Sequence, residues 1–320
     1  MSKPLPEKKE ENPWDAIRSA FNLSTEDEKS IPVQKEKNVP SKPSSKHINN
    51  NDMNANIGWL FYKDYYNGLT DHLWHKVGVK LDDSSHDKKM LKTHFERKNN
   101  EIFVQNVTTE YWNEFDGANL IIPLTTTYPG LVLGTGYSHE TGTDGEFKLG
   151  FYFDWTTGQP VIPGSSVKGV LRSAFNTPEF IKEVLKTKKA TLTLTHELVK
   201  SWELDIFGAK NGDENGRKGK DIFFDAVIKH APEPFMADDF ITPHINRKNI
   251  KMSPFSNPTP LQFLKILPGV TFNFRFKLNE STDLTVIEKK DILAILFENI
   301  LIAYGVGAKT NVGYGNLVKP

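Results

Sequence analysis

The segment of this sequence with the most chemical potential is residues 305–315, GVGAKTNVGYG, in which two Gly-hydrophobic-Gly units are separated by five residues. Glycines such as Gly307 and Gly313 allow positive φ and close backbone approach, and the amides of such a loop can bind phosphate oxygens. Lys309 adds a positive charge, and Tyr314 offers a ring that can stack on a base. Thr310 and Asn311 add hydrogen-bonding groups. The same glycines also suit a tight helix-to-strand turn that binds nothing, so the loop alone leaves both interpretations open.

Two nucleotide-binding motifs are excluded by the details of this segment. Residues 303–310, AYGVGAKT, resemble a phosphate-binding P-loop, but alanines occupy both positions at which that motif needs glycine. The loop also follows a predicted helix, whereas P-loops and dinucleotide-binding loops open one. We therefore expect neither ATP nor a dinucleotide, and no cofactor.

A second candidate site is the predicted start of a helix at residues 162–175, IPGSSVKGVLRSAF. Gly164 follows a proline, and Ser165 and Ser166 can cap the first turn. Helix N-termini attract anions, and Lys168 and Arg172 are four residues apart, so they share one face. An ordinary capped amphipathic helix with two solvated cations explains the same pattern.

Acid–base catalysis has one main candidate, His139, in the polar stretch 136–140, GYSHE, with His244 second. A histidine near a ribose 2′-hydroxyl could act as a general base in RNA cleavage. The interpretation we favour is a surface or interface histidine. Asp238 and Asp239 are adjacent on an extended segment and so point to opposite faces, which does not suit a metal site. No metal-ligand spacing is present, so no metal is expected.

Composition indicates a globular chain without disulfides: there is no cysteine among 320 residues, which fits a reducing cytoplasm. No apolar run reaches the roughly 18–20 residues that cross a bilayer, so no membrane association is expected. The formal net charge is zero, with 40 basic and 40 acidic residues. Residues 240–279 nevertheless contain no acid, which indicates one basic face that includes Arg247 and Lys248. Chance clustering in surface loops is the simpler alternative.

Hydrophobic periodicity predicts an α+β fold in the ferredoxin-like order βαββαβ, with large insertions. The expected strands are 118–126, 221–228, 270–278 and 313–318, and the expected helices are 165–175 and 288–304. A further hairpin is expected from 131–137 and 147–153. Residues 1–54, rich in Pro, Lys, Glu, Ser and Asn, predict a disordered or partner-docking tail, with Trp14, Ile17 and Phe21 at helical spacing. Residues 55–320 are expected to form a single domain with its core at about 117–320.

The two motifs together resemble the RAMP superfamily of CRISPR-associated proteins. That family has ferredoxin-like domains, a Pro-Gly-Ser-Ser-x-Lys-Gly first helix and a C-terminal Gly-hydrophobic-Gly-x5-Gly-hydrophobic-Gly loop. The segments 56–63, 134–136 with His139, 223–226, 238–239 and 243–244 are similar to the small head-end RAMP subunit of the type III-B (Cmr) effector complex.

This resemblance implies a non-catalytic subunit that binds the backbone of the guide RNA near its 3′ end and caps the subunit filament. Its partners would be the guide RNA, other RAMP subunits and small helical subunits, with target RNA as a further candidate. The residues that the resemblance places near RNA are Gly164, Ser165, Ser166, Lys168, Arg172, Gly307, Lys309, Thr310, Asn311, Gly313, Tyr314, His139, His244, Arg247 and Lys248.

Two other function classes stay open at this point. One is a stand-alone, metal-independent endoribonuclease that processes guide RNA with His139. The other is a protein–protein scaffold without RNA contact, in which the basic stretches are incidental. The zero net charge favours a subunit over a free RNA binder, because phosphate neutralisation supplies most non-specific affinity for nucleic acid.

Overall fold

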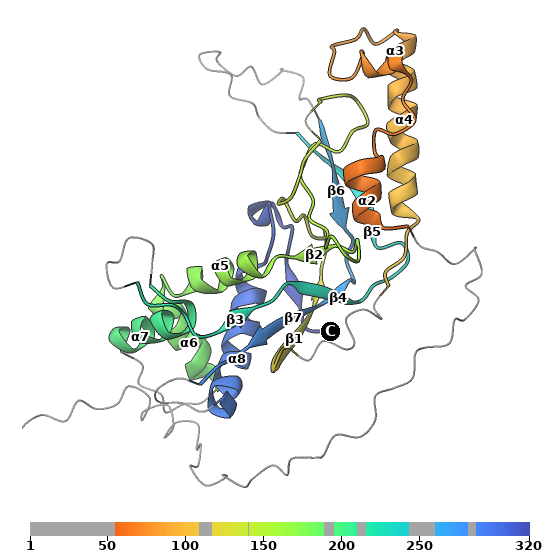
Figure 1. Cartoon of the computed structure of the whole chain (residues 1–320). Coiled ribbons are helices and arrows are strands. Elements are labelled where there is room, and N and C mark those ends of the chain that lie inside the picture. The colour runs from red at the N-terminus through yellow and green to blue at the C-terminus, as the bar shows by residue number, and fades with distance from the viewer. Residues whose placement is uncertain are drawn as a thin grey trace, which may run out of the picture.

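The computed structural model describes residues 55–108, 117–139, 141–188, 195–209, 216–242, 260–280 and 286–320. The predicted tail at 1–54 lies outside these residues, as do His244, Arg247 and Lys248. The described chain is mixed α and β, with a sheet of short antiparallel strands in the lower half of Figure 1 and a helical part above it. No helix among the described residues is long and apolar enough to cross a membrane.

The main sheet is built around β7 (Thr271–Lys277), in the order β2-β4-β7-β1-β8, with β3 also pairing with β7. The other strands are β1 (Leu120–Thr126), β2 (Val161–Ile162), β3 (Ile222–Phe223), β4 (Ala226–His230) and β8 (Leu317–Val318). Neighbouring strands in this sheet pair antiparallel throughout.

The core face of the sheet follows directly from the period-two pattern of β7. Phe272, Phe274 and Phe276 are fully buried. They lie opposite the buried residues Leu124, Ile122 and Leu120 of β1. Alternate residues of a strand point to one face, so the aromatic side of β7 must be covered by other elements.

Four helices accompany this sheet: α5 (Gly164–Ala174), α6 (Pro178–Lys188), α7 (His196–Phe207) and α8 (Val286–Tyr304). α8 packs against both α5 and β1, and its buried residues include Leu296, Phe297 and Ile300. Figure 1 shows α6 and α7 together at the left-hand end of α5. The predicted helices at 165–175 and 288–304 are thus confirmed within two residues at each boundary.

The predicted strands are present with two differences. The strand expected at 221–228 is split into β3 and β4 by a break at Phe224-Asp225, and the last strand is shorter than 313–318. The break has a structural use, because Asp225 serves α5, as described below. The short last strand follows from the loop before it, which turns at Gly313 and Gly315 with positive φ.

The hairpin expected from 131–137 and 147–153 is wrong. These segments contain only isolated bridges, in which Leu131 pairs with Ile266 and Val132 pairs with Ala308. The structure instead has a separate hairpin of β5 (Met236–Ile241) and β6 (Leu261–Ile266), which periodicity did not predict. β5 contains two acidic residues, so its sequence is more polar than that of a typical strand.

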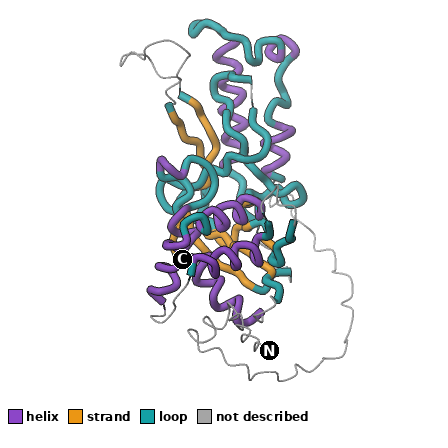
Figure 2. The backbone as a smooth tube through the Cα atoms, turned by 90° about the vertical axis from the view of Figure 1, so that its left-hand side faces the viewer, coloured by secondary structure: helices purple, strands orange, loops and turns teal. Residues whose placement is uncertain are grey.

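The helical part above the sheet consists of α2 (Ile57–Trp59), a π-helical turn at Leu60–Asp64, α3 (Asp71–Trp74) and α4 (His86–Phe103). Its aromatic rings pack onto the irregular segment 131–153. Phe61 and Tyr65 of the helical part and Phe147 of that segment are fully buried at this contact. Figure 2 shows the two-stranded hairpin beside these helices, above the main sheet. The contacts continue into one core, because residues of both parts belong to the same buried cluster.

Candidate functional site

The C-terminal loop leaves α8 at Tyr304 and reaches β8 at Leu317, and its glycines are required by its own backbone. Gly307 has φ 84° and Gly315 has φ 77°. A Cβ at Gly307 would overlap the carbonyl oxygen of Val132, and a Cβ at Gly315 would overlap that of Val306. The glycine signature therefore encodes a tightly folded turn, whether or not a ligand binds there.

Many of the loop amides are engaged within the protein. Val306 donates to the carbonyl of Gly315 at 3.0 Å, Ala308 to that of Val132 at 2.7 Å, and Gly315 to that of Gly130 at 2.8 Å. The expected run of free amides is thus reduced to its tip. Within the described residues, the amides of Lys309, Thr310 and Asn311 make no backbone hydrogen bond.

Lys309 is at the tip of this loop in an unusual conformation. Its φ is 62°, the only positive φ of a non-glycine residue in the described part of the chain. A left-handed conformation costs a lysine roughly 1–2 kcal/mol, and such positions occur often at functional sites. Asn311 is exposed beside it, while Thr310 is half-buried. The tip therefore presents a cation, polar side chains and amides to solvent.

The predicted base-stacking role of Tyr314 is wrong. Its ring is buried, 7% exposed, and packs edge-on against Phe263 at a centroid distance of 5.7 Å. Its hydroxyl donates to Oδ2 of Asp239 at 2.7 Å, and the same oxygen accepts from Lys265 at 2.5 Å. Burial, with the hydrogen bond to Asp239, raises the pKa of Tyr314. The residue anchors the loop to the β5–β6 hairpin.

The N-terminus of α5 already has an anion. The backbone N–H of Gly164 donates to Oδ1 of Asp225 at 2.7 Å. The carbonyl oxygen of Asp225 in turn accepts from Arg275 at 3.0 Å and 3.1 Å. A carboxylate at a helix N-terminus is favourable for the helix dipole, so the amide of Gly164 in the predicted anion site is used by the protein itself. Ser165 is exposed and Ser166 is half-buried on the first turn.

The two cations of α5 differ in their surroundings. Arg172 donates through Nε to Glu203 at 3.0 Å and through Nη2 to the carbonyl of Gly208 at 2.8 Å. It therefore joins α5 to α7, which argues against the predicted RNA contact. Lys168 lies over the ring of Phe223, with Nζ 5.7 Å from the centroid, and makes no ion pair with any described residue. Its charge is available for an anionic partner.

His139 is inside the protein and not at its surface. It is 7% exposed, and its ring stacks on Tyr65 at a centroid distance of 4.0 Å and 9°. Nε2 lies 2.8 Å from the carbonyl of Phe61 and donates to it, while Nδ1 has no partner among the described residues. Burial lowers the pKa of His139. An imidazole held neutral behind aromatic rings cannot reach RNA, so neither the predicted contact nor catalysis by this residue is supported.

This burial predicts a pH dependence of stability. The lowered pKa means that the unfolded chain binds the proton more readily, so the free energy of unfolding falls as pH drops below about 6.5, by at most about 1.4 kcal/mol per pH unit for one histidine. We expect His139→Gln to flatten this dependence, measured by denaturant unfolding between about pH 7 and pH 5. The exposed His86→Gln serves as the control for the loss of one imidazole at the surface. An unchanged slope in His139→Gln would contradict the assignment.

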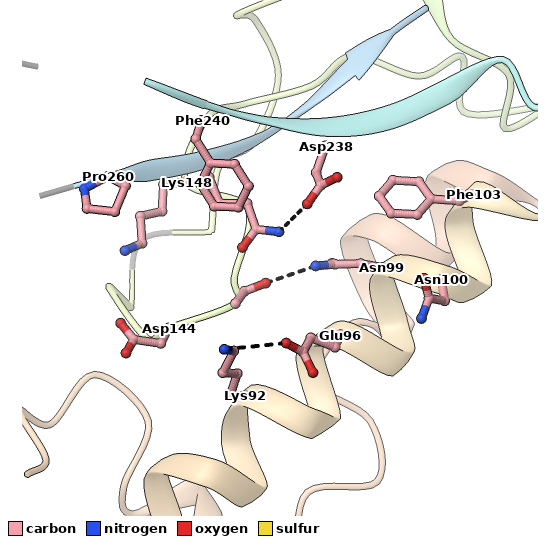
Figure 3. Close-up of a pocket in the computed structure, with 12 residues that line it drawn as sticks. Lys92, Glu96, Asn99, Asn100, Phe103, Asp144, Lys148, Asp238, Phe240 and Pro260 are labelled. Carbon is pink, nitrogen blue, oxygen red and sulfur yellow. Dashed lines mark hydrogen bonds and ion pairs between the residues drawn. The ribbon is translucent and has the colours of Figure 1, made fainter. Parts of the chain in front are cut away.

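A separate hollow of about 560 Å³ lies between α4 and the β5–β6 hairpin (Figure 3). Its polar groups largely satisfy each other: Asn99 donates to the carbonyl of Gly145 at 2.9 Å, and Gln262 donates to Asp238 at 2.7 Å. Asp238 faces this hollow and Asp239 faces Tyr314, which confirms that the two point to opposite faces. None of the site residues predicted from sequence lines the hollow.

Within the described residues, no group of three or more His, Cys, Asp or Glu could hold a metal ion. The candidate site has two parts. The first is the loop tip, with Gly307, Lys309, Thr310 and Asn311, and the second is one face of α5, with Ser165, Ser166 and Lys168. Sequence patterns assigned no structural role to Asp225 or Asp239, because the partners of their carboxylates are distant in the chain.

Comparison with known proteins adds three findings. The sequence model of the RAMP superfamily matches residues 123–318. The CMR subunit Cmr6 of Saccharolobus solfataricus is 28% identical over 171 residues, which cover 52% of this chain and 48% of that protein. Cmr6 of Pyrococcus furiosus is 28% identical over 205 residues, covering 51% and 58% respectively. The chain thus spans about half the length of the curated relatives it matches.

A solved structure, the type III-B Cmr-beta complex bound to cognate target RNA, contains a chain with a similar fold. The TM-score is 0.52 at 23% identity, covering 81% of this chain and 83% of that one. At this identity the likeness concerns the fold alone. The two named relatives are Cmr6 subunits. The comparisons therefore support a Cmr6-like protein, and they do not support the expected role of a small head-end subunit.

Proposed function

The chain belongs to the RAMP superfamily, and from that premise we propose that it is a Cmr6-like subunit of a type III-B CRISPR effector complex that holds the guide RNA without cutting it. The match to two Cmr6 proteins supports the complex. The chain with the similar fold comes from a Cmr complex bound to cognate target RNA, and RNA as a partner of this chain is part of the proposal.

The observation that carries the RNA contact is the tip of the C-terminal loop. Lys309, at φ 62°, is held there by a backbone whose glycines leave no room for side chains. Free amides beside a cation suit the oxygens of a phosphate group. Such contacts are made to the RNA backbone and not to its bases. They therefore suit a guide RNA whose sequence varies.

We assign the guide-RNA contact to Lys309, Thr310, Asn311 and Gly307 of the loop and to Lys168, Ser165 and Ser166 of α5. Gly313 contributes to the loop turn through its positive φ. We also propose RNA contacts for His244, Arg247 and Lys248, on the basis of the sequence alone. We do not assign Arg172, Tyr314 or His139 to the RNA contact, because each of them forms a hydrogen bond within the protein. Placement near the 3′ end of the guide, capping of the filament, and contact with other RAMP and small helical subunits belong to the same proposal.

We also propose that the core is ferredoxin-like. The elements β1, α5, β4, β7, α8 and β8 follow in the order βαββαβ, and their strands lie side by side as β4-β7-β1-β8. In this arrangement α8 packs against β1 and α5 packs against α8 and β3, and the C-terminal loop continues directly from α8.

The test is a charge reversal at both halves of the site, Lys168→Glu with Lys309→Glu. Because two phosphate contacts are lost, we expect the affinity for guide RNA to fall about ten- to hundredfold, and the slope of log affinity against log salt to decrease by about 2. Affinity is measured across a salt series, with the chain alone and in its assembled complex.

The matched control reverses Lys80 and Lys89, two lysines near α3 and α4, which gives the same change in net charge. It should retain RNA. If the site variant behaves like this control, the assignment of the RNA contact to the loop tip and α5 is wrong, and a protein–protein scaffold is the better description. If the isolated chain cleaves a repeat RNA, the enzyme alternative replaces the proposal.

A further inference from the structure

Three aromatic rings form a corner on the surface, outside the residues assigned so far. Trp155 stacks on Tyr62 at a centroid distance of 5.0 Å and 26°. Tyr137 stands at 71° to Trp155 and at 89° to Tyr62. Trp155 is 61% exposed and Tyr137 is 69% exposed. Since Tyr62 covers one face of Trp155, the opposite face lies toward solvent, with Tyr137 as a wall beside it.

The aromatic corner, Tyr62, Tyr137 and Trp155, is held in place from below. The hydroxyl of Tyr62 donates to the carbonyl of Phe151 at 2.5 Å, and burial raises the pKa of Tyr62 to about 12. The turn that carries Trp155 is fixed by Asp154, whose Oδ1 accepts from the amide of Thr157 at 2.7 Å. Rings that are already ordered lose little entropy when a ligand stacks on them.

The segment that carries Tyr137 also contacts the C-terminal loop. Ala308, the neighbour of Lys309, donates to the carbonyl of Val132 at 2.7 Å. A Cβ at Gly134 would overlap the Cβ of Ala308. Tyr137 follows Gly134 by three residues in the same segment. The rings of the aromatic corner therefore belong to a part of the chain that packs against the loop, whereas the ring of Tyr314 is buried and cannot stack on a base.

We propose that the aromatic corner stacks an unpaired nucleobase of the RNA whose backbone crosses the loop tip. This inference rests on the proposed function. An outward-facing indole already stacked on a second ring can extend the stack by one planar group, which every base provides. The exposed chain neighbours of these rings include Lys63, Thr135, Gly136 and Thr156. A cation and small polar groups beside the rings suit the sugar and phosphate of a nucleotide better than an apolar protein surface.

The test compares Trp155→Ala and Trp155→Phe in the full chain. The probes are an unstructured single-stranded RNA of about twelve nucleotides and an abasic ribose-phosphate chain of equal length. We expect Trp155→Ala to bind the RNA about ten- to fiftyfold more weakly, with an unchanged salt slope, because no phosphate contact is lost. Binding of the abasic chain should not change. Trp155→Phe keeps a ring face and should retain most of the affinity.

Trp74→Ala is the matched control. Trp74 is 48% exposed and stacks on Tyr66 at 5.7 Å and 29°, but it lies on α3, at the far end of the molecule from α5 in Figure 1. It should bind RNA like the wild type.

Four outcomes would overturn the inference. If the wild type binds RNA and Trp155→Ala binds it equally well, the stacking role is wrong while the proposed function survives. The stacking role is also wrong if Trp155→Ala loses only assembly with protein partners, or if the wild type binds the abasic chain as tightly as the RNA. Failure of the wild type to bind RNA at all, alone or in its complex, overturns both the inference and the proposed function.

Discussion

Replacing Gly315 by alanine is expected to lower the free energy of unfolding by at least about 2 to 3 kcal/mol and to release RNA from the complex. Gly315 has φ 77°, and an added Cβ would overlap the carbonyl oxygen of Val306. That carbonyl belongs to backbone, which cannot turn aside as a flexible side chain can. The loop must open to accept the methyl group, and the tip that carries Lys309 moves with it.

Gly169→Ala is the matched control for this substitution. Gly169 lies inside α5, is exposed, and an added Cβ there meets nothing within 4 Å. Glycine inside a helix is less favourable than alanine by roughly 0.5–1 kcal/mol, so this variant should be more stable than the wild type by about that amount. Denaturant unfolding of both variants decides the matter. A Gly315→Ala protein as stable as the wild type would show that the loop does not need its left-handed backbone.

The second large effect is expected at Lys289, whose ammonium group is buried in α8 with 1% of its side chain exposed. Its Nζ lies 2.9 Å from both carboxylate oxygens of Asp221, 3.1 Å from the carbonyl of Asn279 and 3.4 Å from Asp205. It thus connects α8 with the segments before β3 and after β7, and with α7. Lys289→Met leaves the buried carboxylate of Asp221 without its cation. We expect a loss of about 3 to 5 kcal/mol in the free energy of unfolding.

The adjacent Lys290 is exposed, and Lys290→Met should change stability by less than about 0.5 kcal/mol. Adding Asp221→Asn to Lys289→Met should recover part of the loss, since the unpaired charge is then removed. If the double variant is less stable than the sum of the two single changes, the unpaired charge is not the cause.

The Lys289→Met deficit should also depend on pH, with a definite sign. Burial already raises the pKa of Asp221 above its ordinary value, and loss of Lys289 raises it further. A carboxyl group whose pKa is raised in the folded state binds a proton that the unfolded chain releases, so the folded state gains as pH falls. The deficit should therefore be larger at about pH 7 than at about pH 5. A constant deficit would mean that Asp221 is not the group left unpaired.

The sequence by itself determined the elements that depend only on residues close together in the chain. The alternation of Phe272, Phe274 and Phe276 predicts β7, because a strand exposes alternate residues to one face. The long stretch 288–304, rich in Ile and Leu, predicts α8. The spacing of the glycines predicts a tight loop after it, since positive φ is a property of single residues. The RAMP resemblance rests on these same local patterns.

The tertiary structure alone decided which polar residues face solvent. The carboxylate of Asp225 that caps α5 is 61 positions away from Gly164. The carboxylate of Asp239, which accepts the hydrogen bond of the Tyr314 hydroxyl, is 75 positions away from that residue. His139 is buried by a contact with Phe61, which is 78 positions away. No periodicity within one segment specifies a partner at such separations. Whether a tyrosine stacks on a base or a histidine meets RNA depends on what packs against it, and that is set only when distant segments meet in the core.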